Sequence, residues 1–367
     1  MSAEAQAEYT GQGGRKMYDI AVVGLGPAGA FLVKHLSKDY RVIAIDKKLP
    51  GERSDFRKPC GGLLSPDAQK SLSRFNMTLP KDVLVSPQIF SVRTIDVKTG
   101  LVRNYQRHYI NLDRHKFDGW LVGQIPGHIE VQSGATCTNI ARESGGLSIT
   151  YTQNNQPREV RAKYIVGADG ANSIVRRSLF GDFRIHTYLS IQQWFADTHS
   201  TPFYSCVFDP ELTDSYAWGL TKDEHFIFGG AFEVKAAKQN FEELKEKLCG
   251  YGFRLENPLK TEACLVLRPT RPGNYCYGDN AAFLIGEAAG FISPSSLEGI
   301  SYAIDSGYAL SQCLNNSSSA PGREYRKRTR KIRMRLAAKF FKRPLLYCQL
   351  SRKLIMKSGL QAIDVLE

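Results

Sequence analysis

The sequence lacks several features that would assign it to a familiar class. No apolar run approaches the ~18 residues of a membrane span, and the stretch IAVVGLGPAGAFLV near the start is interrupted by three glycines and a proline. No small-residue cleavage site follows it, so it is not a signal peptide. The eight cysteines form no CxxC pair and no zinc-type grouping with histidine. We therefore expect reduced thiols, no metal site and a cytoplasmic protein.

Acidic residues are nearly absent from one segment. Residues 323–357 hold 14 Lys and Arg and one acid, Glu324, so this segment carries the whole net charge of +13. Apolar residues at 325, 332, 336 and 340 lie near one helical face. Pro344 is expected to end that helix. The spacing of three further residues predicts a second helix, formed around Leu346, Leu350 and Leu354.

Three interpretations of this basic C-terminal segment, 321–367, remain open. The helices can pack on the rest of the protein with a solvated basic face. Alternatively, residues 323–357 can form a peripheral contact with the anionic inner membrane, since clustered cations and amphipathic basic helices favour such surfaces. Nucleic-acid binding is the third interpretation. It is not expected, because no RNA-binding module is present and the aromatic residues lie on the apolar stripe.

A strand, a glycine-rich turn, a helix and a second strand follow one another from residue 18. The segments are YDIAVV, GLGPAG, AFLVKHLSK and RVIAID. Gly24 allows a tight turn, Gly26 allows the backbone to approach a pyrophosphate, and Gly29 allows close packing of helix on strand. Asp46 ends the second strand 17 residues later and is placed to bind the ribose hydroxyls. This pattern predicts a dinucleotide site at a helix N-terminus.

Two more strand–glycine–helix units occur far along the chain, in KYIVGADGANSIVRR and AAFLIGEAAGF. Short β-branched and aromatic segments lie between the units, which predicts an inserted antiparallel sheet. We therefore expect an α/β plus antiparallel β fold with a Rossmann-like domain. The predicted boundaries are a disordered tail at 1–16, a nucleotide-binding domain at 17–85, 107–182 and 270–320, and a β-rich substrate domain at 86–106 and 183–269.

The second and third units favour FAD over NAD, because a long bent cofactor needs further contacts along its pyrophosphate and ribityl chain. The three motifs together resemble the geranylgeranyl reductase family of the p-hydroxybenzoate hydroxylase superfamily. The resemblance is strongest to its short bacterial members associated with colicin resistance. It covers roughly residues 17–310 and implies FAD as cofactor. It also implies a set of cofactor-binding residues: Gly24, Gly26, Pro27, Ala28, Gly29, Asp46, Lys47, Cys60, Gly61, Gly62, Arg114, Asp169, Gly286, Glu287, Gly299 and Ile300.

The resemblance gives some of these residues separate tasks. Ala28 and Asp46 would line the adenosine end, and Arg114, which precedes a Phe-Asp pair, would face the phosphates. Glu287 would approach the ribityl chain, although the family usually has Asp there. The amides of Gly299 and Ile300 would contact the isoalloxazine ring.

The stretch RKPCGGLLSPDA contains a cysteine beside two glycines. The family carries a Cys-Gly pair in the loop that passes over the flavin, and Cys60 and Gly61 match that pair. Gly61 and Gly62 would let the backbone approach a flat ring. Cys60 is therefore a candidate to contact the flavin and assist catalysis, and a small packing residue is the alternative.

A Tyr-x-Trp strand lines the substrate cavity of the family, and Tyr216 and Trp218 match it on one face of a strand. Leu220 continues this face and Lys222 follows, but the family's Phe-Pro pair is missing. Tyr216 and Trp218 are candidate catalytic residues, and ordinary core packing is the alternative. The expected substrate is an apolar small molecule or lipid.

The resemblance implies reduction of C=C bonds in an isoprenoid or similar substrate, with reduced flavin as hydride donor. An aromatic or polyketide monooxygenase of the same fold is one alternative. Halogenation is not expected, because the Trp-x-Trp-x-Ile-Pro signature is absent. A non-catalytic FAD-binding sensor or interaction protein is an alternative of another class. No second dinucleotide fingerprint is present, so NAD(P)H and a ferredoxin-like protein both remain open as electron donors.

Overall fold

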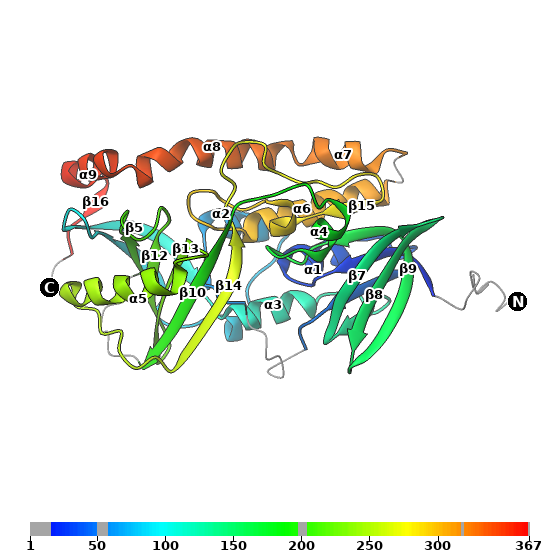
Figure 1. The fold of residues 1–367 in the computed structure, drawn as a ribbon, viewed down its shortest axis with the longest axis horizontal. Helices are drawn as coiled ribbons and strands as arrows, with labels where there is room; N and C mark the ends of the chain where they lie inside the picture. The colour runs from blue at the N-terminus through cyan, green and yellow to red at the C-terminus, as the bar shows by residue number, and fades with distance from the viewer. Residues whose placement is uncertain (1–15, 50–57, 197–203, 317–318, 366–367) are drawn as a thin grey trace, which may run out of the picture.

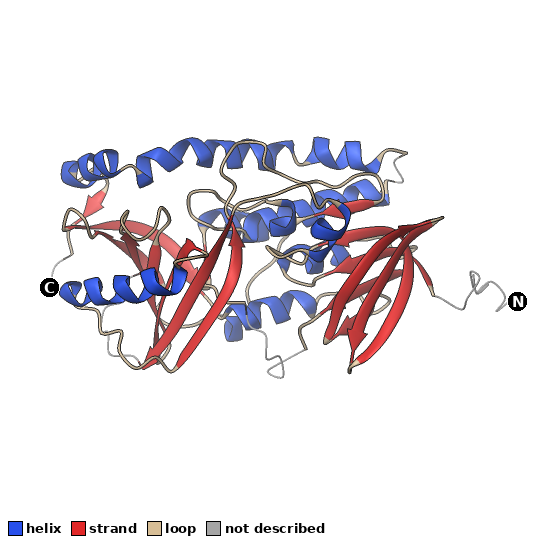
Figure 2. Cartoon of the chain, in the orientation of Figure 1, coloured by secondary structure: helices blue, strands red, loops and turns tan. Residues whose placement is uncertain are grey.

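The structure is a computed structural model that describes residues 16–49, 58–196, 204–316 and 319–365. All but the last residue of the predicted N-terminal tail lie outside these ranges. Two β-sheets stand at opposite ends of the molecule, with helices between them and a long helical arm along one side (Figure 1, Figure 2).

The first sheet is the expected nucleotide-binding sheet. Its central strand pairs in parallel on both sides, with the strand of the predicted βαβ unit and with the strand of the second motif. A two-stranded antiparallel extension lies at one edge. The strands are β1 (Met17–Val23), β2 (Val42–Asp46), β6 (Glu130–Ser133), β7 (Ala135–Glu143), β8 (Gly146–Gln153), β9 (Gln156–Gly167) and β15 (Ala282–Leu284).

Helices cover this sheet because its strands are apolar on both faces, as parallel strands usually are. The buried residues of β1 and β2 pack in one core with α1 and α6. The helices of this part are α1 (Pro27–Lys34), α2 (Pro66–Arg74), α3 (Arg114–Val122), α4 (Ile174–Leu179) and α6 (Ile300–Asn315), with 3-10 turns at η2 (Lys81–Val83) and η4 (Gly286–Ala289).

The second, larger sheet is mostly antiparallel, as expected for the β-rich part. One pair differs from that expectation, because β4 and β11 run parallel and join its two halves. The strands are β3 (Leu63–Leu64), β4 (Ile89–Asp96), β5 (Leu101–Asn111), β10 (Thr187–Ala196), β11 (Tyr204–Phe208), β12 (Ala217–Lys222), β13 (His225–Glu233), β14 (Lys260–Leu267) and β16 (Ala362–Ile363). Helix α5 (Ala237–Leu248), followed by η3 (Cys249–Tyr251), packs on one face through Phe241 and Leu244.

The strand β5 crosses the boundary that the sequence suggested at residues 106–107. Its pairing with β4 continues as far as Ile89 and Tyr109. The strand therefore belongs to the larger sheet along its whole length.

The C-terminal segment forms three helices: α7 (Pro321–Arg328), α8 (Arg330–Tyr347) and α9 (Gln349–Ser358). They form the upper arm in Figure 1, which spans from the first sheet to the second. Of the four residues of the predicted stripe, Tyr325, Ile332 and Leu336 are buried and Phe340 is partly buried, so this part of the segment packs on the protein. Within the described residues, no helix combines the length and hydropathy that crossing a bilayer requires.

Two expectations for this segment were wrong. Pro344 does not end the helix, because α8 continues to Tyr347. Leu346 and Leu350 do not share a helix, because the chain is extended at Cys348, between α8 and α9. Pro344 has no N–H to donate to the carbonyl of Phe340, and α8 nevertheless continues for three further residues.

Candidate cofactor and substrate site

One cavity of about 960 Å³ runs between the two sheets. It is lined by residues of the β1–α1 turn, the 58–63 loop, the 295–300 loop and the α8–α9 region. Fourteen of the sixteen predicted cofactor residues line it, as do Tyr216 and Trp218. The two exceptions are Gly29 and Gly286. Segments far apart in the sequence thus meet along one space, at the upper end of the usual pocket size.

The glycines of the first motif either allow backbone segments to pack closely or leave space for a ligand. Gly24 has φ +96°, and a side chain there would meet the Ala168 carbonyl oxygen at 2.7 Å. A Cβ on Gly29 would overlap the carbonyl of Gly24, so this glycine serves the packing of helix on strand that the sequence predicted. At Gly26 a Cβ would meet nothing within 4 Å. This last position is open, as a ligand contact requires.

The residues at this end fit the phosphates and riboses of a dinucleotide. Helix α1 begins at Gly26 without a side-chain cap, so its N-terminal amides are available to an anion. Asp46 lies at the end of β2, where it accepts hydrogen bonds from the backbone of Leu25 and Lys48. Asp169 accepts from Ile174 N through Oδ2, and its buried Oδ1 has no partner among the described residues.

A buried charge cluster continues the cavity wall. Asp118 accepts from Arg114 Nε at 2.7 Å and from Lys48 Nζ at 2.6 Å. Burial raises the pKa of Asp118, but Arg114 and Lys48 more than offset this and bring it to about 2. The carboxylate is therefore ionised and holds Arg114 at the cavity. The Phe-Asp pair in the sequence predicted Arg114, but it assigned no task to Asp118 or Lys48.

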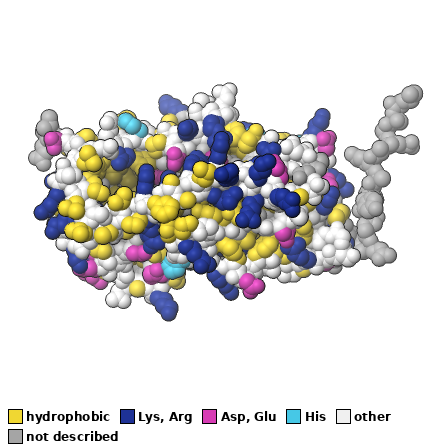
Figure 3. Space-filling model, turned by 90° about the horizontal axis from the view of Figure 1, so that it is seen from above, with side chains coloured by type: hydrophobic (Ala, Val, Ile, Leu, Met, Phe, Trp, Pro, Cys, Tyr) yellow, Lys and Arg dark blue, Asp and Glu magenta, His cyan; other side chains and the backbone are white. Residues whose placement is uncertain are grey.

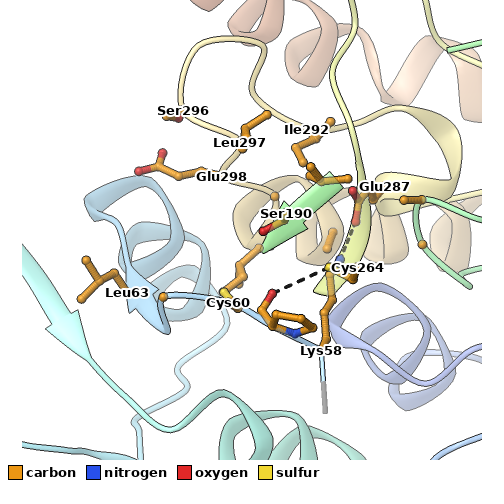
Figure 4. A pocket seen from close by; sticks show the side chains of 18 of the residues that line it. Lys58, Cys60, Leu63, Ser190, Cys264, Glu287, Ile292, Ser296, Leu297 and Glu298 are labelled. Atoms are coloured by element: carbon orange, nitrogen blue, oxygen red, sulfur yellow. Dashed lines mark hydrogen bonds and ion pairs between the residues drawn. The ribbon is translucent and has the colours of Figure 1, made fainter. Parts of the chain in front are cut away.

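Glu287 does not stand alone at its predicted position (Figure 4). Its Oε2 lies 2.5 Å from Lys58 Nζ, and its Oε1 accepts from the backbone of Leu267 at 3.0 Å. Burial lowers the pKa of Lys58, but the facing Glu287 carboxylate outweighs that effect and raises it. The pair ties the loop that carries Cys60 to the third motif. Sequence reasoning missed Lys58, although it precedes Cys60 by two residues.

Cys60 lies in the cavity wall beside Ser190 and Cys264, as Figure 4 shows. Its Sγ accepts from the backbone of Gly62 at 3.4 Å and from an Arg114 Nη at 3.7 Å. Cys264 donates to the carbonyl of Pro59 at 3.9 Å, and burial raises the pKa of its thiol to about 11. Of these two thiols, Cys60 is the one in contact with a guanidinium.

The glycines after Cys60 pack against strand β12. Gly62 has φ +61°, and a Cβ there would lie 2.6 Å from Lys222 Nζ. Lys222 is buried and donates to Asn111 Oδ1 and the Leu112 carbonyl. Burial among these neutral groups lowers its pKa to about 8. The lysine that follows the Tyr-x-Trp pair therefore supports the loop from behind, and it does not line the cavity itself.

The 295–300 loop forms the opposite wall. Leu297 has φ +54°, an uncommon conformation for a side chain branched beyond Cβ. Gly299 begins α6 without a side-chain cap. The amides of Gly299 and Ile300 are thus at a helix N-terminus that borders the cavity, as their predicted contact with a flavin ring requires. Glu298 also lines the cavity, and burial raises its pKa.

Beyond this loop the cavity becomes aromatic. Trp218 lies against Gly61, where an added Cβ would be 3.5 Å from the indole. The Trp218 Nε1 is buried without a hydrogen-bond partner among the described residues. Tyr216 donates its hydroxyl to the carbonyl of Ser296 at 2.7 Å. Further aromatic side chains complete this chamber: Tyr109, Tyr204, Phe208 and Tyr347.

The chain has relatives over nearly its full length. A family model described as an FAD binding domain matches residues 119–223. Protein CbrA of Escherichia coli O6:H1 (strain CFT073) is 48% identical over 350 residues, which is 95% of this chain and 96% of that protein.

Solved structures share the fold at low identity. A geranylgeranyl bacteriochlorophyll reductase-like protein from Thermoplasma acidophilum superposes with a TM-score of 0.75 at 19% identity, over 93% of this chain and 90% of that one. PqsL from Pseudomonas aeruginosa, described as a probable FAD-dependent monooxygenase, gives 0.66 at 14% identity, over 94% of this chain and 100% of that one. The cofactor is FAD, in agreement with the matched domain and the cavity described above. The chain belongs to the CbrA family and is an FAD-dependent oxidoreductase with the fold that these solved structures share.

Proposed function

We propose that this oxidoreductase reduces carbon–carbon double bonds in an elongated apolar substrate of the isoprenoid type. The observation that carries the proposal is the shape and chemistry of the cavity. Past the Cys60–Gly62 loop it is lined by aromatic rings, and it ends among Leu345 and Leu346 of α8, Ile355 and Met356 of α9, and Leu360. A long apolar channel suits a chain-like substrate better than a small polar one. The likeness to a geranylgeranyl bacteriochlorophyll reductase-like structure points the same way.

The chain's own residues would position the alkene and supply a proton. When bound and reduced, FAD supplies a hydride to one carbon of the double bond. We assign the proton for the other carbon to the Cys60 thiol. Arg114 and the Gly62 amide, which already contact its sulfur, would stabilise the thiolate until solvent returns the proton. One hydride and one proton then complete the saturated bond.

Tyr216 and Trp218 have a different task in this scheme. The Tyr216 hydroxyl is engaged with Ser296, and burial holds its pKa well above the ordinary value. It is therefore a poor acid and serves as a wall that fixes the 295–300 loop. Trp218 covers Gly61 and presents a ring face to the substrate. The two electrons come from outside the chain, from NAD(P)H or a ferredoxin-like protein, and either donor satisfies the scheme.

The test is an anaerobic turnover experiment. The bound flavin is photoreduced, a polyprenyl lipid is added, and flavin absorbance and product mass are followed. We expect reoxidation of the flavin together with a product that carries two more hydrogens. Product formation only with oxygen, with oxygen incorporated, would replace the proposal by the monooxygenase. No reoxidation by polyprenyl lipids without oxygen, together with no oxygenated product from phenols when oxygen is admitted, would favour a sensor.

The assignment of Cys60 has its own test, with Cys264 as the matched control. Cys60→Ser should retain FAD and slow product formation by about 100-fold, since a positioned acid typically contributes that much or more. Cys264 lines the same cavity, and the Cys264→Ser variant should keep nearly the parent rate of product formation. Equal rates in Cys60→Ser and the parent protein would leave Cys60 with a packing role only.

A further inference from the structure

The second half of the C-terminal segment exposes apolar side chains to solvent. Nine of the fourteen large hydrophobic residues exposed in the described chain lie between Met334 and Val365, so the exposure is concentrated and not scattered. Seven of them form what we name the apolar ridge: Phe341, Leu345, Leu346, Leu350, Leu354, Ile355 and Leu360. Isolated exposed leucines need no explanation, but a contiguous group of this kind indicates an interaction surface.

The two arginines of the same stretch, Arg343 and Arg352, point the other way and pair with carboxylates of the protein body. Arg352 is 4% exposed and lies 2.6 Å from Asp96, which is fully buried. Leu350 and Leu354, on the same helix α9, are 66% and 62% exposed. Arg343 pairs with Asp214 at 2.8 Å. Helix α9 thus buries Arg352 beside Met356 and exposes two leucines, which differs from the usual arrangement of a surface helix.

The ridge continues into the cavity. Four of its members both line the cavity and are exposed, namely Leu345, Leu346, Ile355 and Leu360. The cavity therefore opens to the surface within the ridge. In Figure 3, which looks down on this side of the molecule, hydrophobic side chains surround a hollow toward the end where α9 lies.

Cations surround the ridge at the surface. Lys342, Lys353 and Lys357 are exposed, and none pairs with a carboxylate in the part of the chain that the structure describes. Figure 3 also shows Lys and Arg gathered along the neighbouring stretch of the arm. An apolar surface bordered by lysines is complementary to a membrane whose headgroups are anionic and whose interior is apolar.

We propose that the apolar ridge docks this protein on an anionic lipid surface, with the cavity mouth facing the acyl chains and the three lysines at the headgroups. The docking surface is the ridge on α8, α9 and the residues before β16, and not the basic stripe of the whole segment. A second copy of the chain is the other conceivable occupant. Charge disfavours it, because two facing ridges would bring their lysines together.

The docking proposal depends only on the apolar ridge. Delivery of substrate from the lipid phase through the cavity mouth depends in addition on the proposed function. If both hold, a substrate dissolved in the membrane reaches the aromatic chamber without crossing water. Docking without turnover would leave the surface assignment intact and remove only the delivery step.

Sedimentation with vesicles tests the docking. The FAD-loaded parent protein is mixed with phosphatidylglycerol–phosphatidylcholine vesicles and with phosphatidylcholine vesicles. The ridge variant carries Leu350→Ser and Leu354→Ser, two positions that do not line the cavity. The matched control carries Val234→Ser and Leu259→Ser, two exposed apolar residues elsewhere. Flavin absorbance and thermal unfolding verify that all three proteins are folded.

We expect the parent and the control to sediment with the anionic vesicles and the ridge variant to bind them at least about tenfold more weakly. Lys353→Gln with Lys357→Gln should weaken binding to anionic vesicles and reduce its salt dependence. Equal binding by the parent and the ridge variant would overturn the proposal. A dimer of the parent in light scattering that the ridge variant loses, without any vesicle binding, would assign the ridge to a second copy instead.

Delivery has a separate readout. The ridge variant should lose turnover of a polyprenyl lipid embedded in vesicles but keep turnover of the same lipid in detergent micelles. Loss of both would contradict delivery through the mouth.

Discussion

Both halves of the C-terminal segment combine cations with apolar residues, but they bury different side chains. In the first half, from α7 to the middle of α8, Tyr325, Ile332 and Leu336 are buried and the cations lie outside. In the second half, Arg352 is buried and leucines lie outside. The difference lies in what each half packs against. Apolar side chains of α6 pack against the buried stripe of the first half, and its Asp305 pairs with the partly exposed Arg335, whereas Asp96 and Asp214 face the second half.

The comparison teaches that an amphipathic pattern identifies two faces without telling which one is buried. A carboxylate fixed in the body of the protein can draw an arginine inward, and the apolar face is then left for another partner.

The largest effect on stability is expected in the second half, when its buried arginine is removed. Arg352→Ala should lower the free energy of unfolding by ~3–5 kcal/mol, because it leaves the Asp96 carboxylate buried without its cation. Chemical denaturation of the FAD-loaded protein measures this. Lys353→Ala, the next residue and exposed, should change it by less than ~0.5 kcal/mol. Equal effects at both positions would mean that α9 is not oriented as described.

The second prediction uses the same residue type in each half. Leu336→Ala removes a fully buried side chain and should cost ~2–5 kcal/mol, from lost burial and the cavity left behind. Leu354→Ala should stay within ~0.5 kcal/mol of the parent protein. Denaturation midpoints and slopes give both values. A large loss for Leu354→Ala would show that another part of the chain covers the ridge.

A smaller effect on stability is expected at Asp214, where the second half pairs with the body of the protein through Arg343. Asp214 faces Arg268, Arg343 and the Tyr188 hydroxyl. Burial raises its pKa, but the Tyr188 hydrogen bond and the two arginines more than offset this and lower it below the ordinary 3.8. Arg343→Met should cost about 0.2–1 kcal/mol at neutral pH, since the pair is partly exposed.

The pH dependence of that variant has a definite sign. The ionised Asp214 stabilises the fold above the ordinary carboxyl range, and this contribution is lost as the pH falls through its lowered pKa. The difference between the parent and Arg343→Met should therefore shrink below pH 3.8. A difference that persists in acid would mean that Arg343 acts through packing and not through charge.

Local motifs made the nucleotide end of the site predictable. Gly24, Gly26 and Asp46 lie within one βαβ unit, where the requirements of the turn and of the anion site act on neighbouring residues. The contact of Lys58 with Glu287 joins residues 229 positions apart, and no local pattern encodes it. The resemblance predicted Arg114, but not the Asp118 carboxylate that holds it.

The mouth of the cavity was not predictable in the same way. The sequence indicated an apolar stripe through Leu346, Leu350 and Leu354 and took it as one helix face. Whether that face is buried depends on Asp96, which lies more than 250 residues earlier. Only the folded arrangement of the two sheets brings that carboxylate to the helix.

The pairing of β16 with β5 has a consequence for how the protein is made. Residues 362–363 complete a sheet whose partner strand was synthesised some 260 residues earlier, at Tyr105 and Asn104. Until residues 362–363 are made and paired, β5 presents an uncovered edge at Asn104 and Tyr105, of the kind that recruits other chains. Translation that stops before α9 would therefore yield a product prone to aggregate, although the nucleotide-binding half is already complete.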